Sequence, residues 1–151
     1  MPHVHKLIDF AVSGFVVNEK KVLLVHHKKL SKWLPLGGHI ELNEDPEEAI
    51  VREVAEESGI KVKVVGERPK IKSPGTKFLH RPRFLDIADL PEGHKHIHFI
   101  YFFKASSNKI RLSEREHSSI KWFTREELGE KDYNIQPSTL YYALQAIKEL
   151  G

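Results

Sequence analysis

Apolar residues near the start of the chain follow the pattern of a β-hairpin. The segment from Leu7 to Val17 is rich in β-branched and aromatic side chains, which favour strands, and Val22–Val25 has the same character. Between the two, Asn18-Glu19-Lys20 is polar and predicts the turn. A polar loop over 28–32 follows, and then Trp33-Leu34-Pro35-Leu36-Gly37-Gly38, whose paired glycines indicate a bend or a close backbone approach.

The clearest helix extends from Pro46 to Ser58. Asp45 is suited to cap it, Pro46 to begin it, and Glu48 stands three residues after the cap, as in a capping box. Gly59 is the natural residue to end it. At about 100° per residue the apolar residues fall on one side of this helix, and three carboxylates fall on the other: Glu53, Glu56 and Glu57.

The second half of the chain alternates between apolar and polar segments. Ile60–Gly66 has strand character, and 67–83 is basic and dotted with proline, which predicts a long loop. Ile97–Phe103 is apolar at both alternating sets of positions, so we expect a strand that is covered on both faces by helices. The chain is therefore predicted to belong to the α/β (α+β) class, with a sheet sandwiched between helices.

Three shorter patterns complete the prediction. Ile120-Lys121-Trp122-Phe123 is a short strand, and Thr124 is placed to cap a brief helix at Arg125–Leu128. A last helix extends from about Pro137 to Leu150, because apolar residues recur there at helical spacing: Leu140, Ala143, Leu144 and Ile147. No repeat or linker interrupts the pattern, so we expect one domain over residues 1–151.

Composition narrows the classes of function. The 151 residues include no cysteine, which excludes a disulfide framework, a thiolate metal site and a cysteine nucleophile. The net charge is only +3, which does not favour a protein that coats duplex DNA or a membrane surface. No apolar run is long enough to span a bilayer, so we expect a soluble, cytoplasmic protein.

The small net charge hides an uneven distribution. Residues 41–57 contain eight acidic residues and one basic residue, a net charge of −7. Residues 61–83 contain eight basic residues and one acidic residue, a net charge of +7. An acidic segment suits a metal ion, and the surrounding basic remainder suits an anionic partner such as a polyphosphate.

The glutamate stripe has two interpretations. Neighbouring like charges on a helix are unfavourable, and an oxygen-rich face of this kind is what Mg²⁺ needs. A Glu-rich helix face is also commonly solvated, in which case Arg52 and Glu56 would form a surface ion pair. The helix alone leaves both interpretations open.

The wider spacing resembles the Nudix box, G-x5-E-x7-R-E-U-x-E-E-x-G-U, where U is aliphatic. Its fixed positions are matched by Gly38, Glu44, Arg52-Glu53, Glu56-Glu57, Gly59 and the aliphatic Val54 and Ile60. The Trp122-Phe123 pair and the following Arg125-Glu126-Glu127-Leu128 are also similar to Nudix (MutT-like) hydrolases. The resemblance implies a mixed sheet between helices. It also implies hydrolysis of a nucleoside diphosphate linked to another group, with Mg²⁺ or Mn²⁺.

The resemblance also implies roles for residues of the box. Glu56 and Glu57 would be the principal metal ligands, together with the backbone carbonyl of Gly37. Glu53 would be a ligand or the base that orients the attacking water. Two residues would support them: Arg52, by ion pairing with the glutamates, and Glu44, by holding the loop or a water of the metal shell.

A further glutamate serves as base or ligand in some family members, and Glu116 is the candidate here. The identity of the base therefore stays open between Glu53 and Glu116. The chain departs from the usual pattern at Leu36, where proline commonly precedes the paired glycines, and at Asn43, where glycine commonly precedes the box glutamate.

Weaker candidates lie outside the box. Lys32 and His39 could meet substrate phosphates, and the amide of Gln136 could read a nucleobase edge, although all three are also ordinary loop residues. His94, His96 and His98 alternate, so in a strand they share a face. Such a face is more often a polar surface or a cleft lining, and a zinc site is the alternative.

These observations predict a Mg²⁺-dependent pyrophosphohydrolase that cleaves the diphosphate linkage of a small nucleotide. Candidate substrates are a nucleoside triphosphate, including an oxidised one, and a nucleoside diphosphate sugar such as ADP-ribose. The alternative is a non-catalytic Nudix-like module that senses a nucleotide or RNA. The isomerase branch resembles enzymes that need a catalytic cysteine, which is absent. Many relatives are dimers, so a homodimer is one alternative for the oligomeric state.

Overall fold

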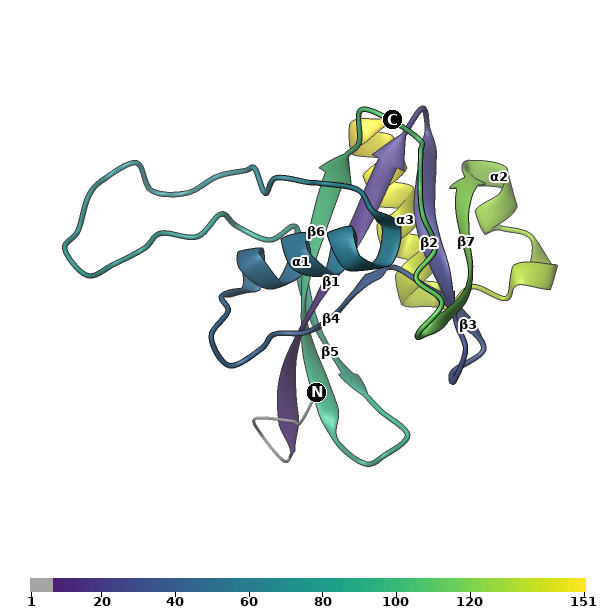
Figure 1. Ribbon diagram of the computed structural model, residues 1–151, viewed down its shortest axis with the longest axis horizontal. Helices are drawn as coiled ribbons and strands as arrows, with labels where there is room; N and C mark the ends of the chain where they lie inside the picture. The colour runs from purple at the N-terminus through teal and green to yellow at the C-terminus, as the bar shows by residue number, and fades with distance from the viewer. Residues whose placement is uncertain (1–6) are drawn as a thin grey trace.

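The computed structural model describes residues 7–151, whose strands form one mixed sheet between helices (Figure 1). The strand order is β3-β2-β1-β6-β5, with β4 pairing to β1 and β7 pairing to β2. The strands are β1 (Ile8–Asn18), β2 (Lys21–His27), β3 (Lys32–Leu34), β4 (Leu36–His39), β5 (Phe84–Asp89), β6 (Lys95–Lys104) and β7 (His117–Thr124). The helices are α1 (Pro46–Ser58), α2 (Arg125–Leu128) and α3 (Pro137–Leu150), with a 3-10 turn at Lys131–Tyr133.

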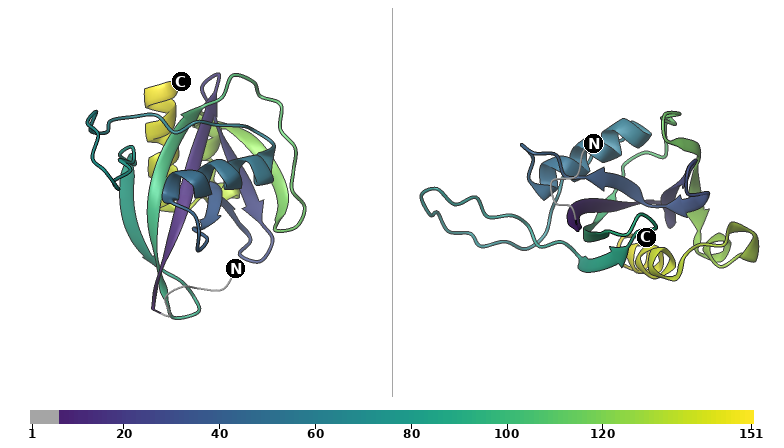
Figure 2. Two further views of the ribbon diagram at one scale, coloured as in Figure 1. Left: turned by 60° about the vertical axis from the view of Figure 1, so that its left-hand side comes forward. Right: turned by 90° about the horizontal axis from the view of Figure 1, so that it is seen from below.

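The centre of the sheet is the parallel pair of β1 and β6, in register from Ile8–Lys95 to Val17–Lys104. Both strands bury side chains on both faces. On one face α1 packs its apolar side over a core that includes Val12, Val16 and Phe103. On the other face α3 covers a second core. Figure 2 shows the two helices on opposite sides of the sheet, which confirms the predicted sandwich.

Local signals fix the ends of α1 as predicted. The Asp45 side chain accepts the Glu48 backbone N–H at 2.8 Å, and the Glu48 side chain accepts the Asp45 backbone N–H at 3.0 Å. Gly59 ends the helix in the left-handed conformation, at φ 78°. The same reciprocal capping joins Thr124 and Glu127 at the start of α2.

The structure corrects one predicted strand and adds three. The prediction of a strand at Ile60–Gly66 is wrong: the segment is extended and buries Val64 against the core under α1, but it joins no strand. Its apolar alternation therefore serves packing without a hydrogen-bonded ladder. Sequence patterns did not indicate β3 and β4, which are short and separated by Pro35, or the edge strand β5.

The basic segment 67–83 is a long loop, as predicted, and it projects from the body of the molecule beside α1 (Figure 1). It returns to the acidic start of α1 through the side chains of two loop residues. Lys77 Nζ lies 2.6 Å from Asp45 Oδ2, and His80 Nδ1 lies 2.8 Å from Glu47 Oε1. Part of the positive charge of this loop therefore balances the negative charge of the box.

None of the helices in residues 7–151 is both long enough and apolar enough to cross a bilayer.

Candidate functional site

Two glycines of β4 bring the backbone of that strand against β1 and α1. A Cβ atom on Gly37 would lie 2.0 Å from the carbonyl oxygen of Val12, so a side chain there would collide with the backbone of β1. A Cβ atom on Gly38 would lie 2.5 Å from Glu53 Oε1. The bare backbone of β4 thus gives the glutamates of α1 the space that they occupy.

Glu57 is held between β4 and β7. Its Oε1 accepts the backbone N–H of Gly37 at 2.7 Å, and its Oε2 lies 2.9 Å from Nε2 of His117. The side chain is 7% exposed. Burial raises the pKa of this carboxyl, whereas the contacts with His117 and Gly37 oppose that rise because they stabilise the charged form.

Glu53 lies one turn before Glu57 on the same side of α1. Its side chain is 15% exposed. Burial, followed by the negative charge of Glu57, raises its pKa to about 7, against the opposing effect of Arg52. A carboxylate with a pKa near neutrality is suited to accept a proton in a catalytic step.

Arg52 organises the remaining carboxylates. Its guanidinium donates to Glu44 in a bidentate manner, at 2.6 and 2.8 Å, and contacts Glu53 at 3.0 Å and Glu56 at 3.3 Å. It also donates to the backbone carbonyl of His39 at 3.3 Å, which ties the helix to the end of β4. The hydrogen bonds from Arg52 lower the pKa of Glu44.

The exposed fractions of the glutamate side chains distinguish a solvated helix face from a cation-binding face. The predicted Arg52–Glu56 ion pair is present, and Glu56 is 61% exposed as a surface residue would be. Glu53 and Glu57, in contrast, are largely buried beside each other. Burying two carboxylates together is costly without cations, so the stripe is not an ordinary solvated face.

Glu116, at the end of the loop before β7, and His117, the first residue of β7, also lie near Glu57. Ligand atoms of Glu57, Glu116 and His117 lie within 4.8 Å of one another, and Glu116 is exposed. The backbone N–H of Lys28 donates to the Glu116 carbonyl at 2.9 Å, which fastens this loop to the end of β2. His117 is absent from the sequence prediction. Its position directly after Glu116, at the start of β7, is the signal that could have indicated it.

The residues present fit a hard divalent cation. Glu44, Glu53 and Glu56 contact one guanidinium, and Glu57 contacts His117, which leaves an excess of negative charge. Their donor atoms are carboxylate oxygens of the kind that Mg²⁺ prefers. Burial raises the pKa values of Glu53 and Glu57 because it destabilises the charged form of each carboxylate. A bound cation would stabilise these charged forms.

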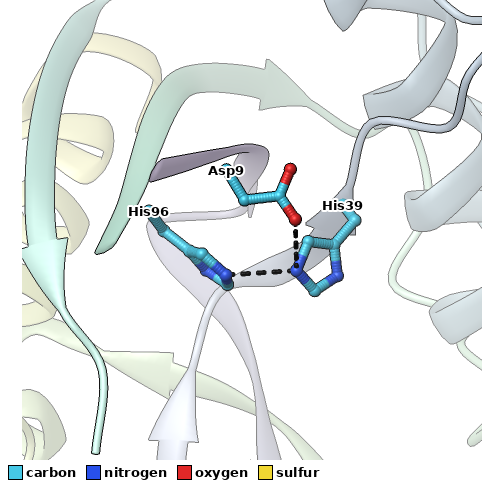
Figure 3. A group of neighbouring side chains, drawn as sticks. All are labelled: Asp9, His39 and His96. Atoms are coloured by element: carbon cyan, nitrogen blue, oxygen red, sulfur yellow. Dashed lines mark hydrogen bonds and ion pairs between the residues drawn. The ribbon is translucent and has the colours of Figure 1, made fainter. Parts of the chain in front are cut away.

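The structure places the remaining predicted residues outside this cluster of box carboxylates. His39, at the end of β4, directs its side chain toward Asp9 and His96 (Figure 3). Lys32 is exposed at the start of β3, and Gln136 is exposed at the start of α3. Substrate binding by these three residues stays a prediction, as do the metal-binding and catalytic roles within the box.

The chain matches known proteins along most of its length. It is 25% identical over 114 residues to a "Probable DHNTP pyrophosphohydrolase" of Lactococcus lactis subsp. cremoris, covering 71% of this chain and 60% of the relative. It is 27% identical over 144 residues to a "MutT-like protein" of Streptomyces ambofaciens, covering 95% of this chain and 79% of the relative. The chain thus spans less than two thirds of the Lactococcus protein.

A solved structure and a family model give a closer match. A Nudix-family hydrolase from Clostridium perfringens shares 37% identity with a TM-score of 0.81, covering 95% of this chain and 98% of that one. A MutT Nudix hydrolase from Burkholderia pseudomallei shares the fold at 18% identity and a TM-score of 0.69, covering 97% and 100%. The NUDIX domain model matches residues 8–144, and the chain therefore belongs to the Nudix hydrolase family.

Proposed function

We propose that this protein is a Mg²⁺- or Mn²⁺-dependent pyrophosphohydrolase that cleaves the diphosphate linkage of a small nucleotide. The observation that carries the proposal is the buried pair Glu53 and Glu57, held against Gly38 and Gly37. Two carboxylates buried side by side destabilise the fold unless their charge is used or compensated. A divalent cation supplies that compensation, and the phosphate oxygens of a substrate would complete its ligand set.

Each residue of the site has a separate proposed role in the reaction. The bound cation would neutralise charge on the diphosphate and lower the pKa of water. Glu57, Glu56 and the carbonyl of Gly37 would hold it. Glu53, with its pKa near 7, accepts the proton of the attacking water, and Arg52 keeps that carboxylate in place. Glu44 fixes Arg52 from the other side.

The substrate is proposed only as a class. The box recognises a diphosphate bridge, whereas the group attached to it is selected by other surfaces. The candidates are a nucleoside triphosphate, including an oxidised one, and a nucleoside diphosphate sugar such as ADP-ribose. DHNTP joins them because it stands in the name of the Lactococcus relative. We also propose that this substrate, rather than duplex DNA, is what the basic remainder of the chain attracts.

The test measures phosphate, diphosphate and nucleoside monophosphate release from this panel with Mg²⁺, comparing the wild type with Glu57→Gln. Glutamine keeps the shape of the side chain and can still accept the Gly37 N–H, but it removes the charge. We expect a loss of at least about 100-fold in turnover, since a metal ligand is removed. Glu126→Gln, an exposed carboxylate on α2, is the matched control and should keep full activity.

Two outcomes would contradict the proposal. Equal, metal-independent turnover by the wild type and Glu57→Gln would show that the box does not carry the chemistry. Tight nucleotide binding by the wild type without turnover of any compound would favour the sensor module instead.

A further inference from the structure

A second cluster of metal-ligating side chains lies on the other face of the sheet. Asp9 comes from β1, His39 from the end of β4 and His96 from β6, so three neighbouring strands contribute one residue each. Alternation along β1 places Asp9 on the same face as Phe15, which packs in the core under α3. The box glutamates approach from α1, on the opposite face.

The ligand atoms of this cluster lie close together, with the His39 nitrogen next to both Asp9 and His96 (Figure 3). Nε2 of His39 lies 3.1 Å from Nε2 of His96 and 3.5 Å from Oδ2 of Asp9, and all three ligand atoms lie within 4.8 Å of one another. Two ligands that each bind Zn²⁺ at about 2.0–2.1 Å in a tetrahedral arrangement stand roughly 3.3–3.4 Å apart. The two measured distances bracket this spacing.

Burial and orientation also suit a bound ion. The Asp9 side chain is 3% exposed, and its Oδ1 accepts the Phe10 backbone N–H at 2.8 Å, while its Oδ2 is directed at His39. The His39 side chain is 27% exposed, which leaves access from solvent.

We propose that Asp9, His39 and His96 form a second metal site, separate from the Nudix box, for a transition-metal ion such as Zn²⁺. Two imidazoles and one carboxylate suit such an ion better than Mg²⁺, which prefers oxygen ligands alone. A tetrahedral ion has a fourth position, which a water or a further ligand would take. Of the three alternating histidines of β6, His96 belongs to this site. The other two ligands, Asp9 and His39, come from the neighbouring strands β1 and β4. The site does not depend on the proposed hydrolysis.

The test titrates Zn²⁺ into the protein by calorimetry in excess Mg²⁺, which occupies the box. We expect one Zn²⁺ per chain in the wild type and a loss of at least about 10-fold in affinity in His96→Gln. His98→Gln is the matched control, because His98 lies on the same strand face but pairs with Asp86 at 2.8 Å. It should bind as the wild type does, and so should Glu57→Gln.

Thermal unfolding supplies a second readout that does not involve activity. Zn²⁺ should raise the unfolding temperature of the wild type and of His98→Gln, because an ion that binds only the folded state stabilises it, and it should not raise that of His96→Gln. If His96→Gln does not fold, His39→Gln takes its place. Equal Zn²⁺ affinity in wild type and His96→Gln, loss of binding only in Glu57→Gln, or no binding in the wild type would each overturn the proposal.

Discussion

A methyl group added at Gly37 of β4 should have a different consequence from one added at Gly38. In Gly37→Ala the new carbon meets the Val12 carbonyl oxygen at 2.0 Å, and both atoms belong to the sheet. In Gly38→Ala it meets Glu53 Oε1 at 2.5 Å, which is the end of a flexible side chain. The first substitution should therefore damage the fold, and the second should damage the site.

The geometry sets the magnitudes. Relieving the contact at Gly37 requires β4 to move about 1 Å from β1, which disturbs their pairing and the Gly37–Glu57 hydrogen bond. We expect Gly37→Ala to lower the free energy of unfolding by about 2–4 kcal/mol. In Gly38→Ala the Glu53 side chain can turn away from the new methyl group, so the stability cost there should stay within about 1 kcal/mol. A carboxylate displaced by about 1 Å should nevertheless lower turnover roughly 100-fold.

Thermal unfolding and turnover of the same samples check both expectations. Gly37→Ala should lower the unfolding temperature by roughly 5–15 °C. Gly129→Ala is the control, because a Cβ there makes only an ordinary contact, 3.7 Å from the Glu126 carbonyl. A Gly37→Ala protein as stable as the wild type would refute the tight β1–β4 approach. Wild-type turnover by Gly38→Ala would refute the importance of the Glu53 position.

Four other substitutions test separate parts of the structure. His117→Ala leaves the buried Glu57 carboxylate without its imidazole partner and should lower the free energy of unfolding by about 1–3 kcal/mol, measured by urea unfolding. Unchanged stability would contradict this expectation. Thr124→Ala removes the cap of α2 and should cost about 1 kcal/mol in the same assay. Lys121 lowers the pKa of Glu127 to about 2, below its ordinary value of 4.5. The resulting stabilisation is present above about pH 4.5 and is lost as pH falls toward 2, so Glu127→Gln should flatten that part of the stability–pH curve. Ile50→Ala leaves a cavity in the core under α1 and should lower the free energy of unfolding by about 2–5 kcal/mol. An alanine substitution at an exposed position should change it little.

Features determined by neighbours in sequence were predictable. The start and end of α1 follow from Asp45, Glu48 and Gly59, which act within one turn of the helix. The covering of β6 on both faces follows from its own apolar residues. The edge strand β5 escaped prediction because it follows a proline-dotted basic loop and leaves Leu85 and Ile87 exposed, so it lacks the pattern of a buried strand.

Features determined by distant residues were not predictable. Ile60–Gly66 has the composition of a strand, yet its side chains fill space beside α1, and composition does not reveal whether a ladder partner exists. Within the box, the spacing indicated which glutamates share a face, but only the packing of β4 shows that Glu53 and Glu57 are buried while Glu56 is exposed. His117 reaches Glu57 because β7 pairs with β2, a long-range relation.

The parallel pairing of β1 with β6 also governs the order in which the molecule can assemble. Ile8 is in register with Lys95, and Val17 with Lys104, so the centre of the sheet joins segments from opposite halves of the chain. Loops of this length close slowly, and parallel pairing delays folding further. During synthesis the β1–β2 hairpin and α1 emerge first, but β1 keeps an open edge until residue 104 has left the ribosome. The nascent chain therefore carries an exposed, apolar strand edge until β6 emerges.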